Sequence, residues 1–165
     1  MAERKYILSK EVAAKKLRRL ALEVVENNYN EPELILIGIR DNGIVLANEI
    51  SGYLKEIFTG EISVIELSLD KKRPSEITLS RSVDFNGKSI LLIDDVANSG
   101  RTLLYALKPF LDYLPKKIQS MVLVERSHNT FPVHPDYVGL SISTTMQEHI
   151  YVEVDGDIVT GAYLA

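Results

Sequence analysis

The stretch Ser89–Thr102, with the sequence SILLIDDVANSGRT, decides the fold expected for this chain. Four apolar residues follow the first serine and predict a strand that is buried on both faces of a parallel sheet. Two adjacent carboxylates, Asp94 and Asp95, end that strand. A turn of small residues around Gly100 comes next, and an apolar-periodic segment that begins at Thr102 predicts a helix. The stretch therefore predicts an α/β domain in which polar side chains gather where a central strand ends.

The loop in this stretch suits an anion that carries a sugar. Backbone N–H groups of the turn point outward and the helix dipole adds partial positive charge, so a phosphate can bind there. The hydroxyls of Ser99 and Thr102 can donate to the same phosphate. Ionised Asp94 and Asp95 only accept hydrogen bonds, which suits the vicinal hydroxyls of a sugar. Two other interpretations stay open, because phosphoacceptor pockets and Mg²⁺ sites also have such acidic pairs, and a strand–Gly–helix turn is common in α/β proteins.

Length and composition indicate one globular domain. The 165 residues are 45% hydrophobic and 25% charged, which is ordinary for a domain with a real core. No cysteine is present, so disulfides and thiolate metal sites are excluded. The net charge of −4 gives no overall attraction to nucleic acid. The basic cluster at residues 15–19 is interpreted as a solvated helix face, with a nucleic-acid patch as the alternative. Without a leader pattern or an 18-residue apolar run, the protein is expected to be soluble and cytoplasmic, with no membrane partner.

Hydrophobic periodicity predicts the remaining elements. Helices are expected after Ser9, from Ile44 to Ile57, and from Thr102 through Leu103, Leu104, Leu107 and Leu111 to a point near Pro115. Strands are expected at Leu34–Ile39, Ile62–Leu69, Ile118–Val124, Tyr137–Ile142, 149–154 and 157–164, the last two joined by a hairpin turn at Asp155 and Gly156. Because βα loops of successive parallel strands face the same carboxyl edge, loop 38–43 is expected to lie beside loop 97–102.

The segment from Asp70 to Lys88 carries much charge and few apolar side chains. A loop of this length can close over a site, which is the favoured interpretation, and a hairpin excursion without a role is the alternative. Residues 125–128 follow the strand at Ile118–Val124, so they can reach the same cleft.

The run LLIDDVANSGRT at residues 91–102 resembles the phosphoribosyl diphosphate (PRPP) signature of type I phosphoribosyltransferases. The resemblance implies a three-layer α/β/α fold with a mainly parallel central sheet and a small C-terminal β hood. It implies a single domain over residues 1–165, with the core at about 9–126 and the hood at about 127–165. The implied reaction is the transfer of phosphoribose from PRPP to a nucleobase, with release of diphosphate and with Mg²⁺ as cofactor.

The same resemblance assigns roles to residues by position. Asp94 and Asp95 are expected to be catalytic at the ribose and to hold Mg²⁺ directly or through water. The 5′-phosphate is expected at Ala97, Asn98, Ser99, Gly100, Arg101 and Thr102. The diphosphate is expected at Arg40, Asp41, Asn42 and Gly43, a loop that in this family often has a non-proline cis peptide. The lid is expected to bring up Lys71, Lys72, Arg73 or Arg81, and the base and hood residues are expected to be His134, Tyr137, Val138, His149 and Ile150.

The run VLVERSHNTFPVHPDYVGLSISTT at residues 122–145 is similar to the pyrimidine-operon attenuation regulators that also act as uracil phosphoribosyltransferases. That resemblance implies conversion of uracil to UMP in pyrimidine salvage, and a homodimer or larger homo-oligomer. Two alternatives stay open. One is an RNA-binding attenuation regulator, which the net charge does not favour, and the other is a PRPP or nucleotide binder that has lost catalysis.

Three positions depart from the family pattern. Asn42 stands where close relatives carry a basic residue, which leaves Arg40 opposed by Asp41 in this loop, so diphosphate is expected to bind more weakly and Asn42→Arg to strengthen binding. Asn98 stands where purine-using relatives carry an acid that handles the base proton, which argues against a purine substrate. His134 stands where relatives often carry Arg or Lys.

Overall fold

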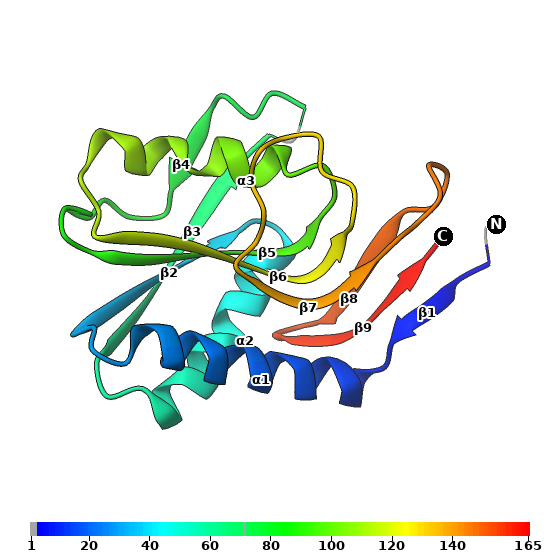
Figure 1. Cartoon of the computed structure of the whole chain (residues 1–165), viewed down its shortest axis with the longest axis horizontal. Coiled ribbons are helices and arrows are strands. Elements are labelled where there is room, and N and C mark those ends of the chain that lie inside the picture. The colour runs from blue at the N-terminus through cyan, green and yellow to red at the C-terminus, as the bar shows by residue number, and fades with distance from the viewer. Residues whose placement is uncertain (1–2, 71) are drawn as a thin grey trace.

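The computed structural model describes residues 3–70 and 72–165, and these residues form two sheets (Figure 1). The larger sheet has the strand order β4-β3-β2-β5-β6-β7, and the small sheet has the order β1-β9-β8. The strands are β1 (Lys5–Leu8), β2 (Glu33–Ile39), β3 (Glu61–Leu69), β4 (Ile77–Leu79), β5 (Ser89–Ala97), β6 (Lys117–Arg126), β7 (Tyr137–Ile142), β8 (Ile150–Asp155) and β9 (Ile158–Leu164). The helices are α1 (Lys10–Asn28), α2 (Asn42–Ile57), α3 (Arg101–Ala106) and the 3₁₀ helix η1 (Lys108–Asp112).

The larger sheet lies between two helical layers, with α1 and α2 on one face and α3 on the other (Figure 1). Five of its strands run parallel and only the short β4 is antiparallel to its neighbour. The central strands β2 and β5 alternate between two cores, so that Leu34 and Leu36 pack with α1 and α2 while Ile35 and Ile37 pack with α3 and η1. Burial on both faces explains their continuous apolar sequence. The predicted three-layer fold with a mainly parallel sheet is confirmed.

The helix predicted after Ser9 is α1, and the Ser9 hydroxyl accepts a hydrogen bond from the backbone N–H of Val12. Part of its basic cluster has a structural use. Lys16 Nζ and Arg19 Nη2 both donate to the carbonyl of Gly139 on β7, at 3.1 and 3.2 Å. Because β7 is an edge strand of the larger sheet, these cations occupy backbone groups that would otherwise face solvent.

The helix predicted from Thr102 to near Pro115 is shorter than expected. α3 ends at Ala106, and the chain continues as η1 with Pro109 near its start. Proline has no N–H to donate to the preceding turn, which favours the tighter 3₁₀ geometry here. The buried positions are therefore Leu103, Ala106 and Phe110, whereas Leu111 is 73% exposed.

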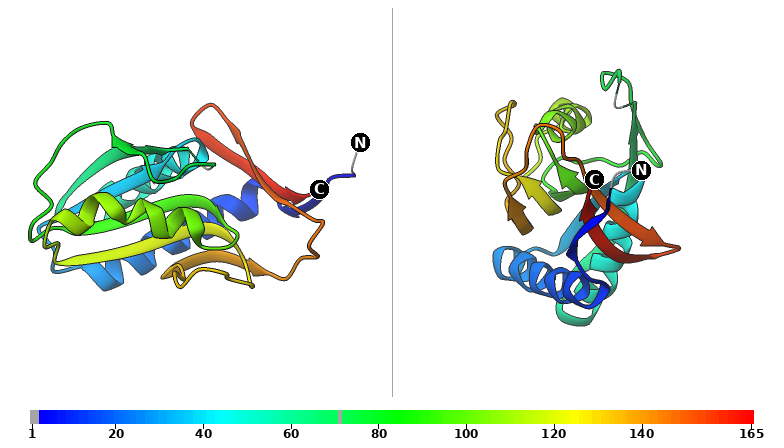
Figure 2. Two further views of the ribbon diagram at one scale, coloured as in Figure 1. Left: turned by 90° about the horizontal axis from the view of Figure 1, so that it is seen from above. Right: turned by 90° about the vertical axis from the view of Figure 1, so that its right-hand side faces the viewer.

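Two strands lie on the other side of the predicted division between core and hood. The strand Tyr137–Ile142, expected in the hood, is β7, which pairs in parallel with β6 and forms an edge of the larger sheet. Conversely, β1 pairs with β9, so Lys5–Leu8 belongs to the small sheet. The half-buried Leu140 and Ile142 pack against the core beneath α1, which holds β7 in the larger sheet. The small sheet stands at one end of the larger one (Figure 2).

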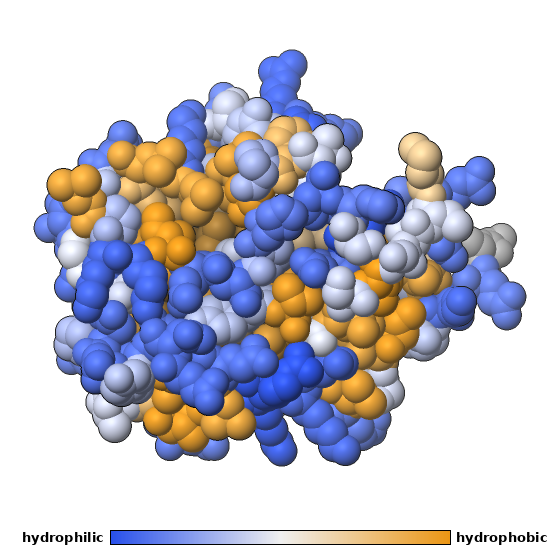
Figure 3. Space-filling view, viewed as in Figure 1, coloured by the Kyte–Doolittle hydropathy of each residue, from blue (hydrophilic) through white to orange (hydrophobic). Residues whose placement is uncertain are grey.

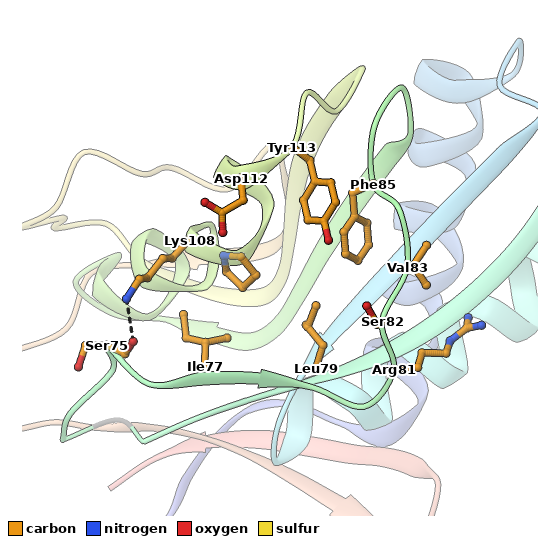
Figure 4. A pocket seen from close by; sticks show the side chains of 11 residues that line it. Ser75, Ile77, Leu79, Arg81, Ser82, Val83, Phe85, Lys108, Asp112 and Tyr113 are labelled. Atoms are coloured by element: carbon orange, nitrogen blue, oxygen red, sulfur yellow. Dashed lines mark hydrogen bonds between the residues drawn. The ribbon is translucent and has the colours of Figure 1, made fainter.

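The segment from Asp70 to Lys88 is anchored along much of its length. It contains β4, which pairs with β3, and Phe85, whose ring packs edge-on against Phe110 and Tyr113 at centroid distances of 4.9 and 5.3 Å. A cavity of about 410 Å³ separates β4 and the following residues from η1 (Figure 4). At one end of it, Lys108 Nζ donates to the carbonyl of Ser75 at 3.0 Å. Since β4 is antiparallel to β3, the two strands have the hairpin geometry of the alternative interpretation, and closure of this segment over a site stays a prediction.

The described part of the chain contains no helix with the length and apolar character that a membrane span needs. On the face shown in Figure 3, hydrophilic side chains divide the apolar surface into separate patches. Some exposed apolar surface is normal for a folded domain.

Glu49 on α2 joins the small sheet to the core and gives a prediction about stability. Its Oε1 accepts a hydrogen bond from the backbone N–H of Val159 at 2.6 Å. Burial raises the pKa of this half-buried carboxyl above its ordinary value of 4.5, and the Val159 N–H opposes that shift only in part. The folded state therefore holds the proton more tightly than the unfolded state, and stability is lost as the pH rises through the raised pKa.

Glu49→Gln keeps the acceptor oxygen and removes the charge. We expect the variant to unfold at a higher temperature than the wild type at pH 8, and at the same temperature at pH 4, where the wild-type carboxyl is protonated. Thermal unfolding at both pH values is the measurement, and Glu56→Gln, an exposed position on the same helix, is the control. If the unfolding temperatures of Glu49→Gln and the wild type differ by the same amount at both pH values, the assigned role of the Glu49 charge is contradicted.

Candidate active site

Two loops that follow neighbouring strands meet at the carboxyl edge of the larger sheet. β2 and β5 pair in parallel, with Gly38 opposite Ile93, so residues 40–43 and residues 98–102 leave the same edge. Gly43 packs directly on β5, where an added Cβ would lie 2.6 Å from the carbonyl oxygen of Ile93 and 3.2 Å from Asp94 Oδ1. The absence of a side chain at this position lets α2 begin beside the acidic pair.

The acidic pair lies within β5, because the strand continues past the predicted end to Ala97. Asp94 is 2% exposed, and its Oδ1 accepts a hydrogen bond from the backbone N–H of Asp95 at 2.9 Å. Asp95 is half-buried, and its Oδ1 accepts from the N–H of Val96 at 2.9 Å. Among the described residues, none of the salt bridges includes Asp95. Its charge is therefore available to hydroxyl groups or to a hydrated cation.

The expected phosphate loop forms a small hollow between β5 and α3. Residues 96–103 line a cavity of about 90 Å³, a volume that suits one small anion. Gly100 has a φ of 85°, in the left-handed region that favours glycine, and α3 begins directly after it. Ser99 Oγ accepts a hydrogen bond from the backbone N–H of Arg101 at 3.3 Å. The structure thus brings together all six residues that the sequence assigned to the 5′-phosphate, from Ala97 to Thr102.

The connection between β6 and β7, residues 127–136, is hydrogen-bonded to this loop. The backbone N–H groups of Thr130 and Phe131 both donate to the carbonyl of Ser99 at 3.0 Å. Asn129 Nδ2 donates to the carbonyl of Val133 at 2.7 Å, and it lies 3.0 Å from the Nδ1 of His134. Sequence reasoning missed this support. The signal was present in the predicted strands, since the loops after two paired parallel strands must meet.

The expected diphosphate loop has a cis peptide between Arg40 and Asp41, as the family resemblance implies. Arg40 Nε lies 3.1 Å from Asp41 Oδ1 and 4.0 Å from Glu66 Oε1, so carboxylates surround its charge. A cavity of about 540 Å³ opens beside this loop, and Asp70 and Glu76 add two more acids to its lining. The loop is therefore less positive than its single arginine indicates.

The side chain of Asn42 is directed to a different partner from the one expected. Its Nδ2 donates to Asp95 Oδ2 at 3.1 Å and to the carbonyl of Val152 on β8 at 3.0 Å. The argument that Asn42→Arg strengthens diphosphate binding assumed a side chain that lines the loop; here the amide is bonded to Asp95 and β8, and the stronger binding stays a prediction. An arginine here would instead meet the carboxylate of Asp95.

Among the described lid cations, Lys72, Arg73 and Arg81 do not line the cavity beside the diphosphate loop. Lys71 lies outside the described residues. Lys72 and Arg73 are exposed, and Arg81 lines the cavity beside η1 (Figure 4). Contact of Lys72, Arg73 or Arg81 with a diphosphate stays a prediction that requires the segment to move.

The residues expected at the base divide into three groups. Tyr137 and Val138 begin β7, and the Tyr137 hydroxyl donates to Gln119 Oε1 at 2.8 Å on the larger sheet, so the expectation that they belong to the hood is wrong. Burial raises the pKa of Tyr137, as expected for a core phenol. His149 is exposed and Ile150 is buried at the start of β8. His134 lies on the connection that supports the phosphate loop.

The described residues contain no group of three or more His, Cys, Asp or Glu side chains arranged to hold a metal ion. The acidic pair instead fits a hard cation that keeps most of its water and substrate oxygens, which is how Mg²⁺ is commonly bound. Asp94 and Asp95 are the residues that would hold it, directly or through water.

Comparison with known proteins gives three results. The profile of the family described as "Phosphoribosyl transferase domain" matches residues 4–156. A "Bifunctional protein PyrR" of Pelotomaculum thermopropionicum is 36% identical over 94% of this chain and 93% of its own, and a "Pyrimidine operon regulatory protein" of Lactococcus lactis is 34% identical over 92% and 90%. A solved hypoxanthine-guanine phosphoribosyltransferase of Bacillus anthracis has the same fold, with a TM-score of 0.73 at 20% identity over 91% of this chain and 87% of that one.

Proposed function

Because this chain belongs to the phosphoribosyl transferase domain family, we propose that it is a PRPP-dependent phosphoribosyltransferase that converts uracil to UMP and releases diphosphate. The observation that carries the proposal is the meeting of three features at one sheet edge. These are the acidic pair of β5, the hollow at residues 96–103 and the loop at residues 40–43. A phosphate, a ribose and a diphosphate occur in this order in PRPP.

The proposed chemistry needs stabilisation of charge more than it needs a strong nucleophile. As the bond from ribose C1 to the diphosphate oxygen breaks, positive charge grows on the ribose and negative charge on the leaving group. Asp94 and Asp95 accept hydrogen bonds from the ribose hydroxyls, and their negative charges stabilise the positive charge that develops on the ribose. Binding of the remote 5′-phosphate by residues 98–102 serves to orient C1 toward the base. Mg²⁺, when bound, would supply positive charge to the departing diphosphate.

Uracil is proposed as the base for two reasons. The run at residues 122–145 resembles regulators that also act as uracil phosphoribosyltransferases, and the L. lactis relative is named for the pyrimidine operon. Asn98, exposed next to the phosphate loop, stands where purine-using members of the family carry an acid that handles the purine proton, and its amide cannot do this. Both reasons favour a pyrimidine.

A diphosphate-release assay tests the proposal, with PRPP, Mg²⁺ and a panel of uracil, cytosine, adenine, guanine and hypoxanthine. Release with uracil and not with the purines is the expected result. Release with a purine alone would contradict the choice of base. No release with any base would contradict the proposed enzyme.

The pair of Arg40 and Asp41 gives a prediction about the leaving group. Asp41→Asn removes a negative charge beside the diphosphate and releases Arg40 from its partner at 3.1 Å. A repulsive charge about 4 Å from a bound anion in water costs about 1 kcal/mol, so diphosphate with Mg²⁺ is expected to bind several-fold more tightly to the variant. Both side chains are mostly exposed, at 65% and 87%, so stability is expected to change little.

Calorimetry of diphosphate and Mg²⁺ on both proteins measures this effect. Asp157→Asn, which removes the same charge from an exposed turn, is the control for net charge. Equal affinities for the wild type and Asp41→Asn would show that the diphosphate binds elsewhere.

A second candidate function is regulation of a pyrimidine operon, which the printed name of the L. lactis relative favours, and the resemblance of residues 122–145 to attenuation regulators adds RNA as the ligand. The basic cluster of α1 offers limited support, because Lys16 and Arg19 donate to β7 and the Arg18 guanidinium lies over the Tyr53 ring at 5.5 Å. Binding of a pyrimidine-operon leader RNA, compared with a shuffled sequence of the same composition, tests this candidate. Equal affinities for the two RNAs would contradict it.

A further inference from the structure

Asn42 is the one side chain in the candidate site that bonds to both the acidic pair and the small sheet among the described hydrogen bonds. Its amide nitrogen donates to Asp95 Oδ2 at 3.1 Å and to the carbonyl oxygen of Val152 at 3.0 Å. A carboxylate and a carbonyl only accept hydrogen bonds, so the NH₂ group is the only end of the amide that satisfies both. The two hydrogens of one nitrogen are therefore both used.

The two partners belong to parts of the protein that no regular pairing joins. Asp95 lies on β5 of the larger sheet, and Val152 lies on β8, which is an edge strand of the small sheet. An edge strand presents backbone groups that no neighbouring strand pairs. Asn42 satisfies one such group from the first residue of α2, and the same helix holds β9 through the contact of Glu49 with Val159.

Asp95 is held from two directions as a result. Its Oδ1 accepts from Val96 and its Oδ2 from Asn42, so one donor fixes each oxygen. Each oxygen keeps a further acceptor position for a ligand. An amide fixes the carboxylate without cancelling its charge, whereas a cation at the same position would form an ion pair with it.

We propose that Asn42 is a positioning residue that holds the carboxylate of Asp95 and strand β8 in one fixed arrangement. The proposal rests on the proposed function, in which Asp95 contacts the ribose, and on the family resemblance, which assigns Ile150 at the start of β8 to the base. The bridge then fixes the distance between the two substrates, and it acts on the rate of transfer more than on the affinity for the 5′-phosphate, which binds a separate loop.

The test replaces Asn42 by aspartate, which has the same shape but turns a donor into an acceptor that faces two acceptors. Asn48→Asp, the same change at an exposed position of the same helix, is the matched control. Without substrates, hydrogen exchange of the β8 amides is expected to be at least about tenfold faster in Asn42→Asp than in the control. With substrates, kcat is expected to fall by about 10–100-fold, while the dissociation constant of ribose 5-phosphate changes by less than about threefold.

Asn42→Ala removes both hydrogen bonds and adds no charge. It is also expected to have faster β8 amide exchange and a lower kcat, and it replaces Asn42→Asp in the test if that variant does not fold. Unchanged β8 exchange, or a kcat equal to that of Asn48→Asp, would overturn the proposal. A loss of ribose 5-phosphate affinity that matches the loss of kcat would also overturn it, because the effect would then be on the phosphate loop. A wild-type protein that turns over no base contradicts the proposed function alone, and the exchange measurement still decides whether the bridge exists.

Discussion

Replacing both Asp94 and Asp95 by asparagine is expected to lower the turnover of PRPP by about 10²–10⁴-fold while the protein stays folded. A hydrogen bond to a charged group is worth roughly 1.5–3 kcal/mol, so two of them to the ribose account for a change of this size. The fold is expected to survive, because the asparagine oxygen at position 94 can still accept from the N–H of residue 95, as Asp94 Oδ1 does at 2.9 Å.

Diphosphate release measures the turnover, and circular dichroism with thermal unfolding checks the fold. The double variant Asp112→Asn with Asp157→Asn changes the net charge equally at two exposed positions and is expected to keep wild-type turnover. Affinity for ribose 5-phosphate is expected to persist in the site variant, since residues 98–102 are unchanged. Turnover near the wild-type level would show that the acidic pair does not act on the ribose.

The substitution Gly100→Ala is expected to weaken the binding of ribose 5-phosphate by tenfold or more. An added Cβ would lie 2.9 Å from the carbonyl oxygen of Val133 and 3.3 Å from that of Phe131, both on the connection that supports the loop. Either this connection or the loop has to shift. The φ of 85° adds a strain of about 1–2 kcal/mol for a residue with a side chain.

Gly87→Ala is the control that has the backbone strain of a positive φ without a steric clash of the added Cβ. Gly87 has a φ of 71°, but an added Cβ there meets no atom within 4 Å. Both variants are expected to lose thermal stability, and only Gly100→Ala is expected to lose affinity, as titration with ribose 5-phosphate would measure. If both variants bind as tightly as the wild type, the phosphate site lies outside this loop.

Strands buried on both faces were the most predictable part of the fold. The apolar runs at Leu34–Ile39 and Ile90–Ile93 each have a core on both sides, so their sequences contain almost no polar residue. The phosphate loop was predictable for a different reason: a glycine in a turn between a strand and a helix is a pattern of neighbouring residues, which the sequence shows directly. The shortening of α3 was also visible, since Pro109 lies inside the predicted helix.

Features that depend on distant pairing could not be predicted in the same way. The strands Tyr137–Ile142 and Ile150–Asp155 have similar apolar content, and only their pairing with β6 or with β9 separates the two sheets. The role of Asn42 depends on where the carbonyl of Val152 lies, which no local pattern around either residue contains. A family comparison by position could show only that a basic residue was missing at Asn42.

The pairing of β1 with β9 has a consequence for the order in which the molecule assembles on the ribosome. β1 is synthesised before every other strand described here, yet its partner β9 is the last of them to be made. The small sheet therefore cannot close until nearly all of the described chain has emerged, and its closure carries the entropic cost of a very long loop. The strand and helix around the phosphate loop lie close together in sequence and can form on a much shorter nascent chain. During synthesis from the N-terminus, the phosphate loop can therefore form before the small sheet does.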